Sequence, residues 1–457
     1  MNRLVSLRVA LALGTTASLL AACGGGGSAA PAVSAVQKVQ ISGTIAGLSP
    51  GTSVVLQDNG ADNLTVTANG TFTFPQDVAA GSAYRVTVPT HPLHETCSVS
   101  NGGGTAAANV TGVVVACSAG PQFVYVANRN DDTVSAYSVD ATSGALTPVP
   151  GSPFATGAYT SPKSIAVNPA GTFAYVVNSG GDSVSVYAID ATTGALTPVP
   201  GSPFATATGT GPVSITINAS DTFAYVTGDS NQTVSAFAID ATTGALTAVA
   251  GSPYSGGGLS FPGSVALNPA GTFVYVANFN GGVTAYTADT TTGALTLMTG
   301  SPFATGNNPN AIAVNPAGTF AYVANLNGGV AAYGIDATTG ALTPVGAAVA
   351  TGTNPAAIAI NSAGTFAYVV GNGSNGVLAC SIDPATGALT PVGAAVAAGS
   401  SPISVAVDPA GTFAYVANEG GGVSAYGIDA TTGALTPVAG SPFAAGSDPR
   451  SVAVAQP

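Results

Sequence analysis

A few charged side chains in this sequence are candidates for chemistry, because each occurs in only one copy of a segment that otherwise repeats. Three are the only cations in residues 121–457, and four are carboxylates that fall in or near the same predicted loops. These seven residues are Arg129, Lys163, Arg450, Asp131, Asp132, Asp182 and Glu419. The cations can pair with the carboxylates as structural ion pairs, or they can bind an anion such as a sugar acid. Both interpretations stay open from the sequence.

Hydrolytic catalysis by these residues is weakly supported. Activation of water and stabilisation of an oxyanion usually use His, Glu and Arg side chains in a cleft. Residues 121–457 contain no histidine and one glutamate, so a Ser-His-Asp triad is impossible there. A carboxylate mechanism with Asp182 or Glu419 is conceivable, but nothing in their spacing indicates it. We predict no catalytic residue, no metal and no cofactor, and we leave enzymatic activity open.

The elements that must position these charges are repeated units of short strands. The motif Phe-x-Tyr-Val begins at residues 123, 173, 223, 273, 320, 366 and 413, at spacings of 50, 50, 50, 47, 46 and 47. Each unit contains four strand-like runs, which we name a to d from the centre outward, and this pattern predicts a seven-bladed β-propeller. Because the b–c and d–a loops open on one face, all three cations are expected on that face, next to the mouth of the central channel.

The last residues of the chain predict how the ring closes. Residues 121–450 contain seven copies of strands b, c and d but only six of strand a. The segment Ser451–Val454 has the sequence of a seventh strand a. We expect it to pair with Phe123–Asn128, which would cover the edge of the first sheet.

Two sets of polar residues recur among the units. A residue that is present in every unit favours a structural role. An aspartate ends strand c in each unit, at Asp140, Asp190, Asp240, Asp289, Asp336, Asp383 and Asp429. Such a side chain can accept backbone N–H groups of the following turn, although a ring of calcium sites is an alternative. A set of asparagines could add neutral hydrogen bonds at the channel mouth: Asn128, Asn178, Asn278, Asn325 and Asn418.

The blocks "PKSIAVNPAGTFAYV", the "YVTG", "YVAN" and "YVVN" copies and the "ID-x-x-TGAL" turns carry a family resemblance. Residues 121–457 resemble the lactonase-type seven-bladed propellers, which include 6-phosphogluconolactonases and surface proteins named for Tyr-Val-Thr-Asn repeats. The resemblance implies the fold. It also implies lactone hydrolysis where the catalytic residues are kept, since a fold alone does not dictate chemistry.

Residues 36–118 differ from the repeats and predict a separate small domain. Their short strand-like runs, separated by Gly, Asn and Pro, indicate a β-sandwich of immunoglobulin-like or prealbumin-like type. Cys97 and Cys117 are expected to form a disulfide in an oxidising compartment, with two free thiols as the alternative. The segment "HPLHE" at 91–95 could be half of a metal site, but a polar loop is the simpler interpretation.

Residues 1–22 indicate an export signal, with Arg3 and Arg8 at the start of an apolar stretch. The ending "LAAC" resembles the lipobox of bacterial lipoproteins, which predicts lipidation of Cys23; an ordinary cleaved signal is the alternative. Residues 23–35 are Gly- and Ala-rich and favour a flexible linker. The Gly after Cys23 favours the outer membrane by resemblance to enterobacterial sorting.

Without residues 1–22 the chain keeps 5 basic and 19 acidic residues, a formal charge of −14, which excludes nucleic acid as a partner.

Three functional hypotheses follow from these observations. The first is an exported, lipid-anchored envelope protein whose propeller binds an anionic sugar or an envelope protein without catalysis. The second is a hydrolase of sugar lactones that uses the face carrying Arg129, Lys163 and Arg450. The third is an architectural protein without a small ligand.

Overall fold

The computed structural model describes residues 36–49, 51–92, 94–207 and 209–457. The predicted signal peptide (1–22), the predicted lipid site Cys23 and the predicted linker (23–35) lie outside these residues. All regular structure in the described residues is β, as expected from the short apolar runs. No helix in this part of the chain is long and apolar enough to cross a membrane.

Residues 38–119 form two four-stranded sheets around one hydrophobic core. The first sheet has the order β5 (Gly70–Thr73), β2 (Ile41–Ala46), β10 (Val110–Ala119) and β8 (Glu95–Ser100). The second has the order β4 (Asp62–Val66), β3 (Val54–Asp58), β7 (Ala83–Thr90) and β9 (Gly103–Thr105). A short pair, β1 (Lys38–Val39) and β6 (Val78–Ala79), completes the domain. Cys97 and Cys117, which face each other on β8 and β10, form the expected disulfide.

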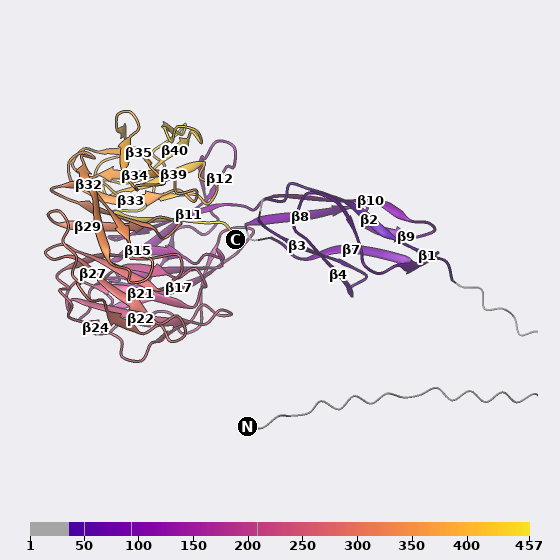
Figure 1. The fold of residues 1–457 in the computed structure, drawn as a ribbon, viewed down its shortest axis with the longest axis horizontal. Coiled ribbons are helices and arrows are strands. Elements are labelled where there is room, and N and C mark those ends of the chain that lie inside the picture. The colour runs from indigo at the N-terminus through magenta and orange to yellow at the C-terminus, as the bar shows by residue number, and fades with distance from the viewer. Residues whose placement is uncertain (1–35, 50, 93, 208) are drawn as a thin grey trace, which may run out of the picture.

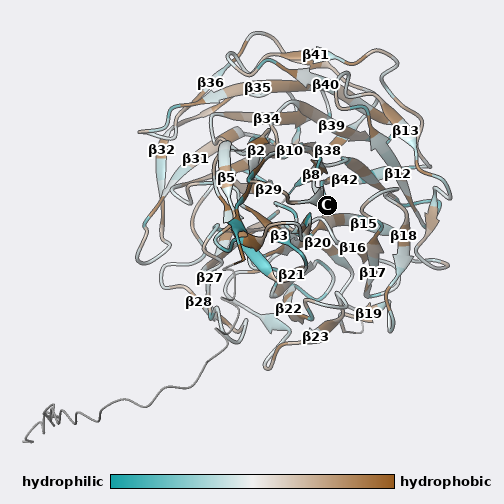
Figure 2. Ribbon diagram, turned by 90° about the vertical axis from the view of Figure 1, so that its right-hand side faces the viewer, coloured by the Kyte–Doolittle hydropathy of each residue, from teal (hydrophilic) through white to brown (hydrophobic). Residues whose placement is uncertain are grey.

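The remaining strands form seven sheets arranged around a centre, which confirms the predicted seven-bladed propeller (Figures 1 and 2). The inner strands a are β42 (Pro449–Ala455), β15 (Pro162–Val167), β20 (Pro212–Ile217), β25 (Pro262–Leu267), β29 (Pro309–Val314), β33 (Pro355–Ile360) and β38 (Pro402–Val407). The strands b are β11 (Phe123–Asn128), β16 (Phe173–Asn178), β21 (Phe223–Gly228), β26 (Phe273–Asn278), β30 (Phe320–Asn325), β34 (Phe366–Gly371) and β39 (Phe413–Asn418).

The two outer strands of each blade follow in the same order, from blade 1 to blade 7. The strands c are β12 (Thr133–Val139), β17 (Ser183–Ile189), β22 (Thr233–Ile239), β27 (Gly282–Ala288), β31 (Gly329–Ile335), β35 (Gly376–Ile382) and β40 (Val423–Ile428). The strands d are β13 (Leu146–Pro148), β18 (Leu196–Pro198), β23 (Leu246–Ala248), β28 (Leu295–Leu297), β32 (Leu342–Val349), β36 (Leu389–Pro391) and β41 (Leu435–Pro437). Four two-residue strands pair with strand c on the outer side: β14 (Phe154–Ala155), β19 (Phe204–Ala205), β24 (Tyr254–Ser255) and β37 (Val396–Ala397).

The ring closes as the sequence predicts. Strand β42, near the end of the chain, is antiparallel to β11 and places Val454 opposite Val124 and Val452 opposite Val126. Blade 1 therefore contains strands from both ends of the propeller sequence, and the exposed edge of β11 is covered.

The recurring Phe-x-Tyr and Thr-Gly-Ala-Leu motifs contact each other between neighbouring blades. In blade 1 the buried Tyr125 hydroxyl donates a hydrogen bond to the carbonyl of Gly194 in blade 2, at 2.8 Å. Gly194 also packs against the ring of Phe123, so closely that a Cβ would overlap it. Blade 7 contacts blade 1 in the same way, because Tyr415 donates to Gly144 at 3.2 Å. The motifs recur because each blade must bind the next.

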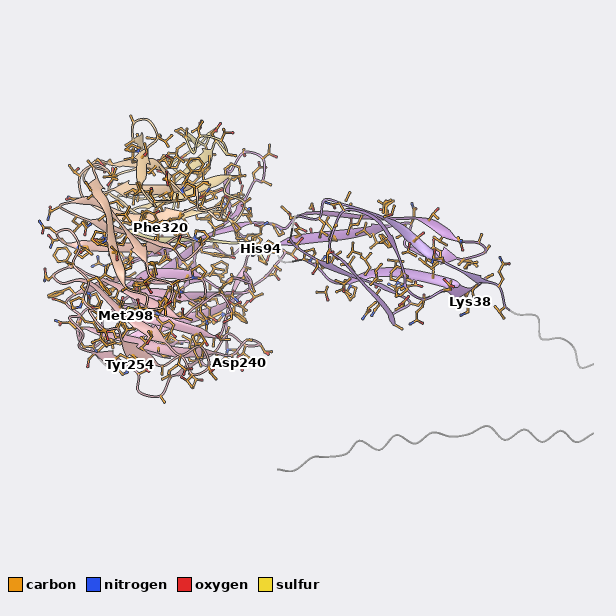
Figure 3. The ribbon with its side chains drawn as sticks, viewed as in Figure 1. Lys38, His94, Asp240, Tyr254, Met298 and Phe320 are labelled. Carbon is orange, nitrogen blue, oxygen red and sulfur yellow. A yellow bond between two sulfur atoms is a disulfide. The ribbon has the colours of Figure 1, made fainter. Side chains whose placement is uncertain are left out.

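The sandwich joins the propeller at the face that carries the a–b turns. Gly120 donates its N–H to the carbonyl of His94, and the Gln456 side chain, just after β42, donates to the same carbonyl. His94 lies at the junction in Figure 3, whereas β1 lies at the far end of the sandwich in Figure 1. Because the N-terminal end of β11 faces the sandwich, its C-terminal end and the following b–c loop lie on the opposite face. We call that opposite face the loop face.

Candidate functional site

The mouth of the central channel on the loop face is a cavity of about 250 Å³. Each inner strand contributes the residue after its first proline: Arg450, Lys163, Val213, Gly263, Asn310, Ala356 and Ile403 in blades 1 to 7. Lys163 and Arg450 are thus neighbours on the rim, as predicted, and the other five positions are uncharged.

Serine side chains below this rim connect the inner strands. The Ser451 hydroxyl accepts the N–H of Ile165 in blade 2, at 3.2 Å, and the Ser404 hydroxyl accepts the N–H of Val452 at 3.2 Å. Strand a has an edge that faces the channel, and these hydroxyl groups bond N–H groups on that edge. The wall of the cavity is therefore held by contacts between blades.

Arg450 is paired with two carboxylates. Its guanidinium donates a hydrogen bond to Glu419, from the b–c loop of blade 7, and its Nε lies 2.9 Å from Oδ1 of Asp448. Asp448 also lies 3.5 Å from Nη1 of Arg129, so one carboxylate is shared by two cations. These contacts connect blades 7 and 1 at the closure, as the structural interpretation of the charges expects.

Lys163 has a different partner, Asp229, whose Oδ2 lies 3.6 Å from Nζ. Both side chains keep about a third of their surface exposed, so this pair adds little to stability. Asp229 and Asp448 were missed in the sequence analysis. Asp448 could have been found by comparing the repeats, because it is the only charged residue at its position. The other six copies have Ser, Gly, Phe or Asn there.

Asp132 and Asp182 hold loops in place. Asp132 accepts the N–H groups of Tyr159 and Ser161, both at 2.7 Å, and so connects the b–c loop of blade 1 to the d–a loop that follows it. Asp182 makes the equivalent bonds to Gly209 and Gly211 in blade 2, at 2.7 and 2.8 Å. Burial by itself would raise the pKa of Asp132, but the N–H groups of Ser161 and Tyr159 hold this pKa below its ordinary value.

We expect these loop contacts to be lost in acid. A carboxylate whose pKa is lower in the folded state contributes stability above its unfolded pKa, and this contribution disappears as the pH falls through the folded pKa. The protection factors of the Tyr159 and Ser161 amides, which compare the observed exchange rate with the intrinsic rate at the same pH, should therefore fall below about pH 4, before the propeller unfolds. In Asp132→Asn the protection factors of these amides should depend less on pH. Equal pH dependence in both proteins would contradict the assigned role.

Asp131 also contacts the closure of the ring. Its Oδ2 accepts the N–H of Ser447, in the loop before β42, at 2.5 Å. Every one of the seven predicted site residues thus has a defined partner. The structure brings Arg129 and Arg450 together around Asp448, and Glu419 pairs with Arg450. It places Lys163 beside Arg450 on the rim but paired with a separate carboxylate.

The recurring polar residues have structural contacts. Each strand-c aspartate accepts N–H groups of its own turn, as predicted; Asp140, for example, accepts those of Thr142 and Ser143 at 3.1 and 2.8 Å. The expectation that the recurring asparagines line the channel mouth is wrong. They are completely buried at the ends of strand b, where the Asn128 amide donates to Ser135 at 2.9 Å.

The two histidines and the glutamate of the "HPLHE" segment have separate partners. His91 Nδ1 accepts the N–H of Cys97 at 2.9 Å, His94 Nδ1 contacts the carbonyl of Gln456, and Glu95 accepts the N–H of Ser49 at 3.0 Å. In the described residues no group of three or more His, Cys, Asp or Glu side chains is arranged to hold a metal ion. His94 has a role that the sequence did not predict, because it contacts the propeller.

Comparison with solved structures shows the same fold in proteins of low sequence identity. A proposed 6-phosphogluconolactonase from Bacteroides uniformis aligns with a TM-score of 0.61 at 18% identity, over 73% of this chain and 99% of that one. One from Bacteroides fragilis aligns with a TM-score of 0.61 at 21% identity, over 73% and 98%. The periplasmic gluconolactonase of Pseudomonas aeruginosa aligns with a TM-score of 0.63 at 19% identity, over 73% and 99%.

Among curated proteins no significant match to this chain was found. The model of one protein family, described as "Lactonase, 7-bladed beta-propeller", matches residues 82–204, 161–354 and 347–453. These matches together span well over half of the chain and include all seven blades. The chain therefore belongs to the seven-bladed β-propeller lactonase family.

Proposed function

We propose that this protein is a lipid-anchored protein of the cell envelope whose propeller binds a ligand or a protein partner without catalysis. The observation that carries the proposal is the pairing of the cations at the channel mouth. Arg450 and Arg129 share Asp448, and Lys163 is paired with Asp229, so each positive charge is already compensated. An oxyanion would have to compete with these carboxylates for the same donors.

The orientation of the two domains supports a role in presentation. The described chain begins next to β1, at the end of the sandwich far from the propeller (Figure 1). An anchor at Cys23 would precede this end. The sandwich would then act as a spacer, and the loop face, on the far side of the propeller, would point away from the membrane. The outer membrane is the site that we propose, from Gly24 after the predicted lipid site.

The lipid anchor has a direct test in cells. Cys23→Ser is expected to abolish labelling of the protein by radioactive palmitate, because the thiol that would carry the thioether-linked lipid is then missing. Cys380→Ser is the matched control, since Cys380 is buried in the propeller. Unchanged labelling of Cys23→Ser would contradict the anchor.

The second candidate function, hydrolysis of a sugar lactone, is favoured by the family and by one structural observation. Lys163 and Arg450 lie side by side on the rim of a cavity. Both would have to exchange their carboxylate partners for the substrate during a reaction cycle.

A turnover assay distinguishes the two functions. Purified protein is expected to hydrolyse glucono-δ-lactone and 6-phosphogluconolactone no faster than buffer does. Hydrolysis that Lys163→Ala and Arg450→Ala both reduce by about a hundredfold or more would establish the lactonase instead. Asp240→Ala, in an exposed turn on the other face, is a control that leaves the mouth intact.

A further inference from the structure

The loop face contains a second concave region, over blades 4 and 5, that differs in chemistry from the channel mouth. Cavities of about 570 and 410 Å³ lie side by side there and share Asn327. The first is formed by loop residues between 279 and 282 and between 302 and 309, and the second by residues between 326 and 329 and between 348 and 354. The residues that line both cavities include no Asp, Glu, Lys or Arg. We call this region the amide groove.

At the amide groove, the loops of blades 4 and 5 lack the contact that an aspartate makes between the loops of blades 1 and 2. The b–c loops of blades 1 and 2 have four residues, and the last one, Asp132 or Asp182, binds the d–a loop. In blades 4 and 5 the b–c loop has three residues, and strand c begins directly with Gly282 or Gly329 at positive φ. The aspartate that bonds the two loops in blades 1 and 2 therefore has no counterpart in blades 4 and 5, and at blade 4 the Asn308 amide and the Phe279 carbonyl join the loops instead.

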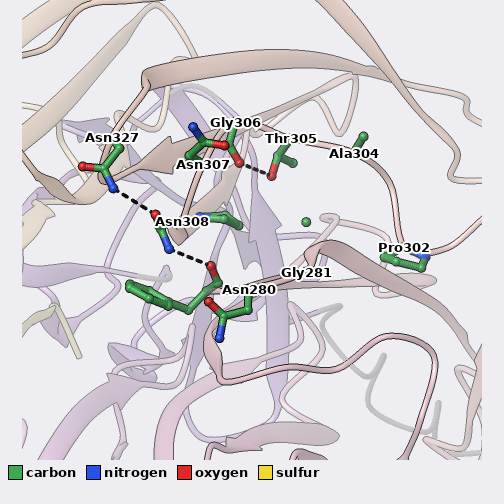
Figure 4. A pocket seen from close by; sticks show the side chains of 12 residues that line it. Asn280, Gly281, Pro302, Ala304, Thr305, Gly306, Asn307, Asn308 and Asn327 are labelled. Atoms are coloured by element: carbon green, nitrogen blue, oxygen red, sulfur yellow. Dashed lines mark hydrogen bonds between the residues drawn. The ribbon is translucent and has the colours of Figure 1, made fainter.

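Asparagine side chains surround the larger cavity (Figure 4). The Asn327 amide donates to Oδ1 of Asn308 at 2.9 Å, and the Asn308 amide donates to the carbonyl of Phe279 at 3.2 Å. This chain of bonds fixes the orientation of two amides before a ligand binds. Asn280 and Asn307 are exposed at the rim. A primary amide offers two donors and an acceptor with two lone pairs, which matches the mixed donor and acceptor character of hydroxyl groups.

An aromatic ring stands beside these amides. Phe279 is 39% exposed and lines the larger cavity, and its N–H donates to the carbonyl of Phe261, which is 52% exposed, at 3.1 Å. An exposed ring presents an apolar, weakly negative face to the C–H groups of a sugar ring. The volume of each cavity is within the range of small-molecule sites, roughly 300–1,000 Å³.

We propose that the amide groove binds a neutral oligosaccharide. Amides for hydroxyl groups, an aromatic ring for a sugar face and the absence of charged lining residues agree on this ligand class. An anionic ligand would find no cation among the lining residues. A peptide strand would need a free sheet edge, whereas the walls here are turns. The proposal rests on the non-catalytic binding role proposed above, but it places the ligand away from the charged mouth.

The first test is an array of neutral glycans, acidic glycans and hexapeptides, probed with the mature chain. The neutral glycan that binds best is then titrated by calorimetry. Phe279→Ala should weaken binding about tenfold or more. Tyr159→Ala is the matched control, because Tyr159 is an aromatic residue of the same face that is 88% exposed and lies beside the charged residues of blade 1. It should leave the affinity unchanged. Both side chains are exposed, so both variants should melt like the parent protein.

The proposal is overturned if no neutral glycan binds, or if binding is equally strong in Phe279→Ala. It is also overturned if hexapeptides rather than glycans bind in a manner that requires Phe279. The failure of the proposed function looks different: lactone hydrolysis that depends on Lys163 and Arg450 would contradict the non-catalytic role. Glycan binding at Phe279 would still be decided separately by the same titration.

Discussion

A chain that ends at residue 448 is expected to lose the cooperative unfolding transition of the propeller. Strand β42 (Pro449–Ala455) supplies the inner strand of blade 1 and pairs with the whole length of β11. Without it, β11 becomes an uncovered sheet edge inside the ring, with unpaired backbone groups. Val452 and Ala455 are 5% and 2% exposed and belong to the two hydrophobic cores on either side of blade 1. Their removal opens both cores.

The measurement is calorimetry or chemical denaturation of the truncated and full chains. A matched control removes only Gln456 and Pro457, which follow the strand. This variant loses the contacts of Gln456 with His94 and Gly120 but keeps every β42–β11 residue pair. It should retain a cooperative propeller transition. If the chain ending at 448 unfolds at the same midpoint as the full chain, the closing strand has no such role.

Gly387→Ala is expected to destabilise the propeller by roughly 2–5 kcal/mol. Gly387 has a φ of +74°, where an L side chain is strained by about 1–2 kcal/mol. In addition, a Cβ at this position would overlap the ring of Phe320 in the preceding blade. Relief of the overlap would move this ring or the hydrogen bond from Tyr322 to the Gly387 carbonyl, now 3.0 Å, at a cost of about 1–3 kcal/mol.

Blade 6 contains a control that separates the two effects. Gly393 has a similar φ of +68°, but nothing lies within 4 Å of a Cβ built there. Gly393→Ala should therefore show only the backbone strain, about 1–2 kcal/mol. Denaturation gives the free energy of unfolding of each variant. The difference between the two variants is the cost of the close contact between Gly387 and Phe320. Equal destabilisation would show that the close contact between blades contributes nothing.

The same comparison applies around the ring. The glycines that contact a phenylalanine of the preceding blade are Gly144, Gly194, Gly244, Gly293, Gly340, Gly387 and Gly433. All have positive φ. Their recurrence at one position of each unit is visible in the sequence, but the reason for it is not. The reason is the approach of another blade.

Properties that depend on a local, repeated pattern could be predicted from the sequence. The seven Phe-x-Tyr-Val motifs predict the number of blades, and the incomplete last unit predicts that Ser451–Val454 pairs with Phe123–Asn128. The strand-c aspartates were correctly interpreted as turn residues, because an Asp side chain bonds backbone groups only two or three residues away. The disulfide between Cys97 and Cys117 followed from the context of an exported chain.

Properties that depend on distances between different blades were decided only by the tertiary structure. The sequence indicated which cations share a face, but not that Asp448 lies between Arg129 and Arg450, or that Lys163 pairs with Asp229 in the next blade. The predicted role of the strand-b asparagines failed because burial depends on how sheets pack, which a polar residue type does not reveal. The amide groove was not predicted at all. It is formed by b–c and d–a loops that are far apart in the sequence, and residues such as Phe279, Asn308 and Asn327 come together only when these loops lie beside each other in space.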